Sequence, residues 1–301
     1  MKISLFSTSL TALDLREAIR VTAQVGYDAI EILCAPPHLT LAMAESRTDE
    51  VRAWLREVRL PVSALSLSVE YTSEDAATWR ANVDETCRFI RLCKRFETNV
   101  VKIMPGRPGS AQATAGHWDR YRRAMDVIVP VAESEGVRLA LETHLNHLSD
   151  SIETAARCLE CGGPGVLGVN LDFCNVRTCH EDPLEAMERF GSRIFLTHVK
   201  DSLFTTASGE YVPMGRGRMD YRPIMERLRA VGYEGYLSVE CLYPWAKDDD
   251  PRGAAARKPC ARLVAHDLAV VQCFCPTARP ACRPLGQKHR RLQMGEEEKG
   301  Q

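Results

Sequence analysis

Four side chains of the types that bind divalent metal ions occur near the ends of successive strand-like segments in the second half of the chain. They are Glu142 in VRLALETH, Asp172 in VLGVNLDF, His198 in IFLTHVK and Glu240 in YLSVECLY. Side chains alternate along a strand, so each of the four shares a face with the residues two positions away. If those faces point into a common barrel, all four side chains converge at its mouth.

Three carboxylates and one imidazole suit a hard or borderline divalent ion such as Mg²⁺, Mn²⁺, Co²⁺, Fe²⁺ or Zn²⁺. The set contains no thiolate, which argues against a structural zinc site. Any one buried Glu or Asp could instead be a polar group satisfied within the barrel. Four such groups in succession are harder to explain in that way, because unpaired buried carboxylates repel one another strongly without a cation. The sequence therefore predicts one bound divalent metal ion of open identity.

Strand-like and helix-like patterns alternate along most of the 301 residues. The expected strands are Lys2–Ser7, Tyr27–Leu33, Val62–Ser68, Asn99–Met104, Val137–His144, Val166–Phe173, Ile194–Lys200 and Tyr236–Tyr243. The expected helices are Leu13–Val25, Glu45–Val58, Ser73–Phe96, Ala115–Glu135, Ser151–Cys161, Pro183–Phe190, Tyr221–Val231 and Gly253–Gln272. Eight strand–helix units in about 270 residues match the size and period of a (β/α)₈ TIM barrel. An open doubly wound sheet usually has a glycine-rich first turn, which Ser7-Thr8-Ser9 is not.

The composition limits where the protein works and what it binds. The chain is 45% hydrophobic and 26% charged with a net charge of −1, which excludes a disordered chain and gives no general attraction to nucleic acid. No apolar run approaches the ~20 residues of a membrane span, and the first residues do not resemble a signal peptide. We expect a cytoplasmic protein with a small-molecule, carbohydrate-like substrate and neither a membrane nor a nucleic-acid partner. The sequence leaves open whether it forms a homo-oligomer.

The predicted barrel domain covers residues 1–272, and apolar periodicity ends where residues 273–301 begin. That last segment, rich in Pro and Arg and with a run of three glutamates, predicts a disordered tail. Most of the twelve cysteines lie in apolar runs and are expected to be reduced. A zinc site built from Cys158, Cys161, Cys174 and Cys179 is disfavoured, because the first pair ends a helix at one end of the barrel while Cys174 follows a strand at the other end.

The segments ALETH, VNLDF, THVKD and LSVE, in this order and spacing, resemble the xylose isomerase-like TIM barrel superfamily in its sugar phosphate isomerase/epimerase branch. The resemblance covers roughly Met1 to Gln272, with GYDAIEI and MGRGRMDY as further parts of it. It implies that Glu142, Asp172, His198 and Glu240 hold one divalent metal ion. By analogy with the ketose epimerases of the family, Glu142 and Glu240 would also be the catalytic acid and base on opposite faces of the substrate.

One position departs from the family pattern. Many epimerase and inosose dehydratase members carry a histidine three residues after the aspartate of the sixth strand, where this chain has Asn175. The resemblance therefore does not assign the chain to either subgroup. The endonuclease IV branch needs further histidines on earlier strands, where Ser68 and Met104 stand, so nuclease activity is not expected.

The expected activity is a metal-dependent isomerisation or epimerisation of a sugar, cyclitol or hydroxy-ketone through a metal-stabilised enediolate. A carboxylate removes the proton next to the carbonyl and a proton returns to the same or the neighbouring carbon. Expulsion of a β-hydroxyl from the same intermediate would make the protein a lyase, such as an inosose or 3-dehydroshikimate dehydratase. A barrel that binds sugar without converting it is the third alternative.

Further residues near the strand ends are candidates for binding the substrate. His144 shares a face with Glu142, and Lys200 shares one with His198. Arg216 lies between two glycines in a loop that could reach over the mouth. Lys102 could face either the barrel or the helices, whereas Glu31 faces inward and is expected to close the barrel floor or to pair with a cation.

Overall fold

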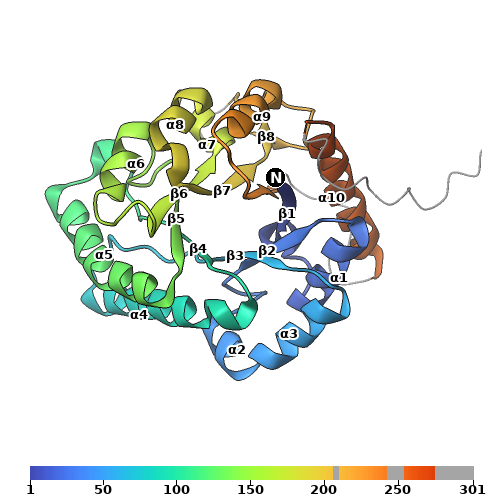
Figure 1. Ribbon diagram of the computed structural model, residues 1–301, viewed down its shortest axis with the longest axis horizontal. Helices are drawn as coiled ribbons and strands as arrows, with labels where there is room; N and C mark the ends of the chain where they lie inside the picture. Colours follow the sequence, from blue (N-terminus) through green and yellow to red (C-terminus); the bar gives the residue numbers. More distant parts are fainter. Residues whose placement is uncertain (206–209, 243–253, 275–301) are drawn as a thin grey trace, which may run out of the picture.

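Eight parallel strands close into a barrel in the computed structural model, which describes residues 1–205, 210–242 and 254–274 (Figure 1). In their order around the barrel the strands are β1 (Lys2–Phe6), β10 (Tyr236–Val239), β7 (Ile194–Val199), β6 (Leu167–Asp172), β5 (Arg138–Glu142), β4 (Val100–Ile103), β3 (Val62–Ser66) and β2 (Ala29–Leu33). Each strand lies within the segment predicted for it. The (β/α)₈ fold expected from the sequence is confirmed.

Helices surround the barrel on its outside (Figure 1). They are α1 (Leu15–Val25), α2 (Leu41–Ser46), α3 (Thr48–Glu57), α4 (Ala76–Leu92), α5 (Ala115–Glu135), α6 (Ile152–Leu159), α7 (Phe173–Thr178), α8 (Pro183–Phe190), α9 (Tyr221–Ala230) and α10 (Ala254–Phe274). Side-chain caps fix several helix starts: Asp14 accepts from the backbone N–H of Glu17 before α1, and Asp75 accepts from that of Thr78 before α4. Gly26 ends α1 in the left-handed conformation with φ 103°.

The structure differs from the sequence prediction in the helices more than in the strands. The helix expected over Glu45–Val58 is interrupted at Arg47, which separates α2 from α3. The helix expected over Ser73–Phe96 begins later, because Asp75 caps it, and its last turn is the 3₁₀ helix η2 (Cys93–Phe96). Helix α7 and the short antiparallel pair of β8 (Asp201–Ser202) and β9 (Tyr211–Val212) were not expected.

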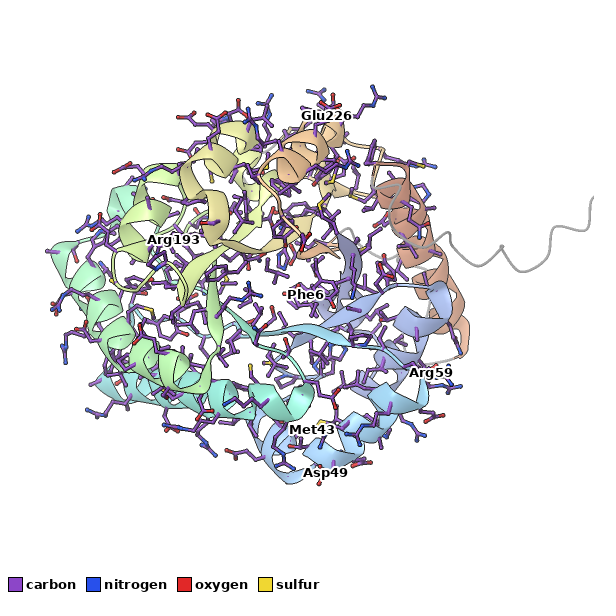
Figure 2. All side chains as sticks on the ribbon, in the orientation of Figure 1. Phe6, Met43, Asp49, Arg59, Arg193 and Glu226 are labelled. Carbon is purple, nitrogen blue, oxygen red and sulfur yellow. The ribbon has the colours of Figure 1, made fainter. Side chains whose placement is uncertain are left out.

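The barrel interior is polar near the C-terminal ends of the strands, and the layer of residues before it is apolar. Ala64, Ala140 and Leu196 belong to a small buried cluster separate from the main core between strands and helices. Two residues further along the same strands lie Ser66, Glu142 and His198, all buried. Successive inward positions of a barrel strand form stacked layers, so the apolar layer supports the polar one from beneath. Charged residues such as Asp49, Arg59 and Glu226 lie at the periphery instead (Figure 2).

The predicted C-terminal tail falls mostly on residues that the structure does not describe. Helix α10 runs to Phe274, two residues past the predicted boundary, and residues 275–301 lie outside the described part, as do 206–209 and 243–253. Within the described ranges, no helix has the length and apolar character needed to cross a membrane. The nine cysteines whose side chains the structure describes are free.

Candidate functional site

Glu142, Asp172, His198 and Glu240 meet at the end of the barrel where the strands finish. Glu142 is the last residue of β5, Asp172 is the last of β6, His198 lies in β7, and Glu240 directly follows β10. One potential ligand atom from each lies within 4.8 Å of those of the others, and all four residues are buried. The structure thus brings together the four residues that the sequence predicted as metal ligands.

The imidazole of His198 is held in one orientation by Glu31 of β2. Its Nε2 donates to the two carboxylate oxygens of Glu31 at 3.0 and 3.1 Å. The ring is fully buried and stacks on Phe6, with 5.2 Å between ring centroids; Phe6 lies inside the ring of strands (Figure 2). A proton fixed on Nε2 leaves the lone pair on Nδ1, the atom that then acts as a metal ligand.

That Nδ1 atom faces the three other carboxylates. It lies 3.7 Å from Glu142 Oε1, 3.8 Å from Asp172 Oδ2 and 3.7 Å from Glu240 Oε2, and it has no hydrogen-bond partner among the described residues. An unpaired buried nitrogen is costly, at about 1–3 kcal/mol, unless something else binds it. The four atoms therefore surround a position that suits a cation.

Glu31 is ionised although it is completely buried. Burial alone would raise its pKa, but His198 and the hydroxyls of Ser66 and Ser238, which both donate to it, hold the pKa below the usual value. A permanent negative charge behind the imidazole makes Nδ1 a stronger metal ligand. Glu31 thus acts on the site through His198, to which both of its carboxylate oxygens are hydrogen-bonded.

Two buried lysines complete the site. Lys102 Nζ lies 2.8 Å from Glu142 Oε2, and Lys200 Nζ lies 2.7 Å from Asp172 Oδ2 and 2.6 Å from Glu240 Oε2. Burial opposes the charge of Lys200, but Asp172 and Glu240 raise its pKa well above the usual value. Burial also opposes the ionisation of Glu142, yet Lys102 and His198 keep its pKa well below the usual value.

The charges of the site favour a divalent cation. The four carboxylates of Glu31, Glu142, Asp172 and Glu240 face only two ammonium groups, so two negative charges remain uncompensated when all four carboxylates are ionised and the imidazole is neutral. The same imbalance raises the pKa of His198 well above its usual value against the effect of burial, chiefly through Glu31 and Glu240. A proton neutralises only part of the excess, whereas one divalent ion balances it completely. This buried group of carboxylates and imidazole could therefore hold a metal ion of the oxygen-preferring or borderline kind.

The predicted substrate-binding residues have different positions. Lys200 is part of the buried site, where its Nζ contacts both Asp172 and Glu240. His144 is half-buried beside it, where its Nδ1 donates to the backbone carbonyl of Leu145 at 2.7 Å. Arg216 is exposed in the loop before α9 and makes no side-chain ion pair within the described ranges. Only Lys200 of the three contacts the carboxylates directly.

Asp201 fixes the loop that carries Arg216. Its Oδ2 accepts from the backbone N–H groups of Gly215 and Gly217, both at 2.9 Å, and its Oδ1 accepts from that of Met219 at 3.1 Å. At Gly217 a side chain would collide with the carboxylate of Asp201, since an added Cβ would lie 2.0 Å from Oδ1. Glycine is thus required at position 217 by its close approach to Asp201 of β8.

The departure at Asn175 is accommodated structurally. Its backbone N–H donates to Asp172 Oδ1 at 2.9 Å, so Asp172 caps α7 with one oxygen and faces the other ligands with Oδ2. The side chain of Asn175 donates to the carbonyl of Thr143 at 3.1 Å. Asn175 therefore supports two of the ligand-bearing strand ends without contributing an imidazole.

The contribution of Glu31 to metal binding through His198 can be tested by removing its charge. We expect Glu31→Gln to weaken divalent-metal binding by about 10–100-fold, because the imidazole keeps a hydrogen-bond partner but loses the charge behind it. A competition titration of Zn²⁺ or Co²⁺ against a chelating dye would measure the change. Glu70→Gln, at a carboxylate paired with Arg107 away from the four ligands, is the matched control and should bind the metal as the wild type does. Equal affinities of Glu31→Gln and this control would contradict the role of Glu31.

Comparison with known proteins agrees with this architecture. The family model described as "Xylose isomerase-like TIM barrel" matches residues 19–265. The fructoselysine 3-epimerase of Shigella flexneri is 23% identical over 258 residues, which cover 80% of this chain and 90% of the epimerase. The 3-dehydroshikimate dehydratase of Bacillus anthracis is 22% identical, with 82% of this chain and 93% of the dehydratase covered. The crystal structure of the IOLI protein with a bound zinc atom superposes with a TM-score of 0.73 at 20% identity, over 91% of this chain and 99% of that one.

Proposed function

The chain belongs to the xylose isomerase-like TIM barrel family, and from this premise we propose that it is a divalent-metal-dependent isomerase or epimerase of a sugar, a cyclitol or a related hydroxy-ketone. The observation that carries the proposal is the arrangement of three carboxylates around Nδ1 of His198 at the barrel mouth. Glu142, Asp172, His198 and Glu240 would hold the metal ion. Relatives of the chain include both an epimerase and a dehydratase, so the family alone does not choose the reaction.

Glu142 and Glu240 would transfer the proton. They come from β5 and from the end of β10, with β6 and β7 between them, and so approach the site from its two sides. A metal ion in this site would polarise the substrate carbonyl and acidify the neighbouring C–H. One glutamate would remove that proton, and the other would return a proton to the opposite face of the same carbon, which inverts its configuration. Return of the proton to the neighbouring carbon gives isomerisation instead.

Lys102 and Lys200 would hold the polar groups of the substrate. Each ammonium group has three N–H donors and uses some of them on the carboxylates. The remaining donors would hydrogen-bond to oxygens of the substrate and stabilise the negative charge that develops after proton removal. Both lysines are about 3% exposed, so the charge would develop in a site largely closed to water.

The alternative is a lyase on the same scaffold, and the similarity to 3-dehydroshikimate dehydratase favours it as the second candidate. Elimination needs the same first step, removal of the proton next to the carbonyl, followed by loss of a β-hydroxyl group. A single glutamate suffices for that removal, while Lys102 or Lys200 would donate a hydrogen bond to the leaving oxygen. The two reactions thus differ in how many of the two glutamates they need.

Solvent exchange of the substrate proton tests the proposal. The protein is supplied in turn with Mn²⁺, Co²⁺, Zn²⁺ and Mg²⁺ and incubated in D₂O with a panel of ketoses and cyclitols. We expect deuterium to be incorporated at the carbon next to the carbonyl of one substrate class, and an epimer or isomer of that substrate to form. Proton NMR and mass spectrometry measure both changes. Loss of water from the substrate to give a product that absorbs as a conjugated enone indicates the lyase instead.

The control is the same protein treated with a chelator, which should neither exchange nor convert the substrate. If the metal-loaded protein binds a substrate of the panel yet exchanges no proton and releases no product, it is a binding protein and the proposed chemistry is wrong. Exchange that persists unchanged after the metal has been removed would equally contradict the mechanism.

A further inference from the structure

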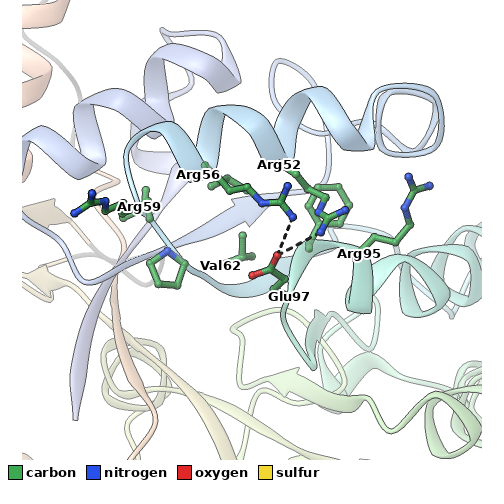
Figure 3. Close-up of a pocket in the computed structure, with 10 residues that line it drawn as sticks. Arg52, Arg56, Arg59, Val62, Arg95 and Glu97 are labelled. Carbon is green, nitrogen blue, oxygen red and sulfur yellow. Dashed lines mark hydrogen bonds and ion pairs between the residues drawn. The ribbon is translucent and has the colours of Figure 1, made fainter.

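A second pocket lies at the opposite end of the barrel, where the strands begin. It has a volume of about 220 Å³ and is bordered by the end of α3, the start of β3 at Val62, and the segment from η2 to Glu97 (Figure 3). Four arginines line it: Arg52, Arg56, Arg59 and Arg95. None of its lining residues belongs to the metal-binding group, which lies at the other ends of the strands.

Positive charge exceeds negative charge around this pocket. The two carboxylates in contact with the arginines are those of Glu97 and Asp49. Glu97 Oε1 accepts from Arg52 and Arg56, both at 3.4 Å, as the dashed lines in Figure 3 show. Four guanidinium groups therefore share two carboxylates, and Arg59 has no acidic partner in the part of the chain that is described.

The contacts that Glu97 makes are weak enough to be replaced by a ligand. Its side chain is 70% exposed, and exposed ion pairs contribute only about 0–1 kcal/mol each. The Nε atom of Arg52 is buried and lacks an acceptor within the described ranges. A ligand with several acceptor oxygens could therefore bind these guanidinium groups more completely than Glu97 does.

The backbone keeps Arg59 at the pocket in a conformation that arginine seldom adopts. Arg59 follows α3 with φ 55°, in the left-handed region where glycine is the usual residue. Its N–H donates to the carbonyl of Arg56 and that of Leu60 donates to Leu55, so carbonyls at the end of the helix are already satisfied. The carbonyls of Leu55 and Arg56 at this helix end are therefore paired within the chain.

The floor of the pocket is apolar. Leu60, Val62 and Phe96 line it and are buried, with exposed fractions of 5%, 6% and 2%. In Figure 3, Arg59 and Arg95 lie on opposite sides of this floor. A ligand that fits therefore combines several negative charges with a flat apolar part, because arginine forks match phosphate and carboxylate oxygens while the floor excludes water.

We propose that this arginine pocket is a binding site for a small organic polyanion, of which a nucleoside diphosphate is the type: its phosphates contact arginines of the pocket and its base packs over Leu60, Val62 and Phe96. The site is separate from the proposed reaction and does not depend on it.

Calorimetric titration of the full-length protein with three probes, in buffer without divalent metal ions, tests the proposal. ADP carries both charge and a base, pyrophosphate carries charge alone, and adenosine carries the base alone. We expect one ADP per chain, weaker binding of pyrophosphate and none of adenosine. Raising the salt concentration to about 200 mM should weaken ADP binding without abolishing it, because screening reduces only the charge contribution.

Variants connect the binding to the arginines. We expect Arg59→Gln combined with Arg95→Gln to weaken ADP binding by on the order of tenfold or more, since charge-assisted hydrogen bonds are lost. Glu97→Gln should tighten it, because it frees Arg52 and Arg56. The matched control is Arg122→Gln with Arg123→Gln on α5, which removes two exposed arginines outside the pocket.

Three results would overturn the proposal. They are no binding of ADP at millimolar concentration, equal weakening in the pocket variant and the α5 control, and unchanged or weaker binding in Glu97→Gln. Pyrophosphate binding as tightly as ADP would overturn the role assigned to the apolar floor. All variants change exposed side chains, so thermal unfolding close to that of the wild type is expected and can be verified before each titration.

Discussion

Replacing Glu142 and Asp172 together by alanine is expected to eliminate divalent-metal binding. The two residues supply two of the three carboxylates that face Nδ1 of His198. Replacing a residue that is only hydrogen-bonded to a metal ligand typically lowers metal affinity by about 10–100-fold, so the loss of two ligands should lower the affinity further. Elemental analysis after gel filtration measures the effect directly: we expect close to one divalent ion per wild-type chain and none above background in the variant.

The double variant also leaves Lys102 without its partner and Lys200 with Glu240 alone, which could lower the stability of the fold. Glu142→Gln with Asp172→Asn keeps the shapes and hydrogen-bonding capacity, and it should lose the metal while unfolding close to the wild-type temperature. Glu74→Ala with Asp119→Ala, which removes two exposed carboxylates of the same kinds, is the control that keeps the metal. A wild-type protein that takes up no metal, even after incubation with Mn²⁺, Co²⁺ or Zn²⁺, would disprove the proposed mechanism.

The positions of the four candidate ligands could be predicted because each stands near the end of a strand-like segment, and those of β5, β6 and β10 show a clear alternation. In β5 and β6 the residues preceding Glu142 and Asp172 at two-residue intervals are small or polar, Ala140 and Asn170 among them, whereas the intervening ones are large and apolar. This alternation separates the inside of a barrel from the surface covered by helices. Residues near the end of every strand then meet at one mouth, although they are far apart in sequence.

Lys102 could not be assigned in the same way. The segment NVVKIM is apolar on both sides, as is usual for a parallel strand covered by helices, and so it does not reveal which side faces inward. The structure resolves this through register, because Lys102 pairs with Ala140 of β5 and so lies beside Glu142. Register between strands is a tertiary property that one strand's pattern does not contain.

Glu31 was expected inside the barrel, paired with a cation or closing the floor, and the structure places it there, fully buried and hydrogen-bonded to His198. What the sequence did not reveal is that Ser66 and Ser238 also donate to it. A shift in register between Ile30 and Glu31 where β2 meets β3 sets which residues lie opposite. A register shift of this kind depends on how the strands pack in the closed barrel, which the sequence of one strand does not contain.

Replacing Glu240 by glutamine should separate the two halves of the proposed proton transfer. We expect turnover to fall by about 10²–10⁴-fold, the usual contribution of an acid or base, while the metal remains bound through the other ligands. If the reaction is epimerisation, Glu142 still serves one face of the substrate. One epimer incubated in D₂O should then exchange its proton with solvent without being converted to the other.

Glu142→Gln is the matched variant and should show the same behaviour starting from the opposite epimer, because Glu240 then remains as the base. Proton NMR of the recovered substrates distinguishes the two cases. Isomerisation or water loss needs only one face, so one variant would then keep its activity far better than the other. Loss of exchange from both epimers in both variants, with the metal still bound, would mean that the two carboxylates do not act as independent bases. The comparison thus distinguishes a two-base epimerase from a one-base isomerase or lyase. The set of proposed metal ligands cannot make this distinction, because all three reactions use it.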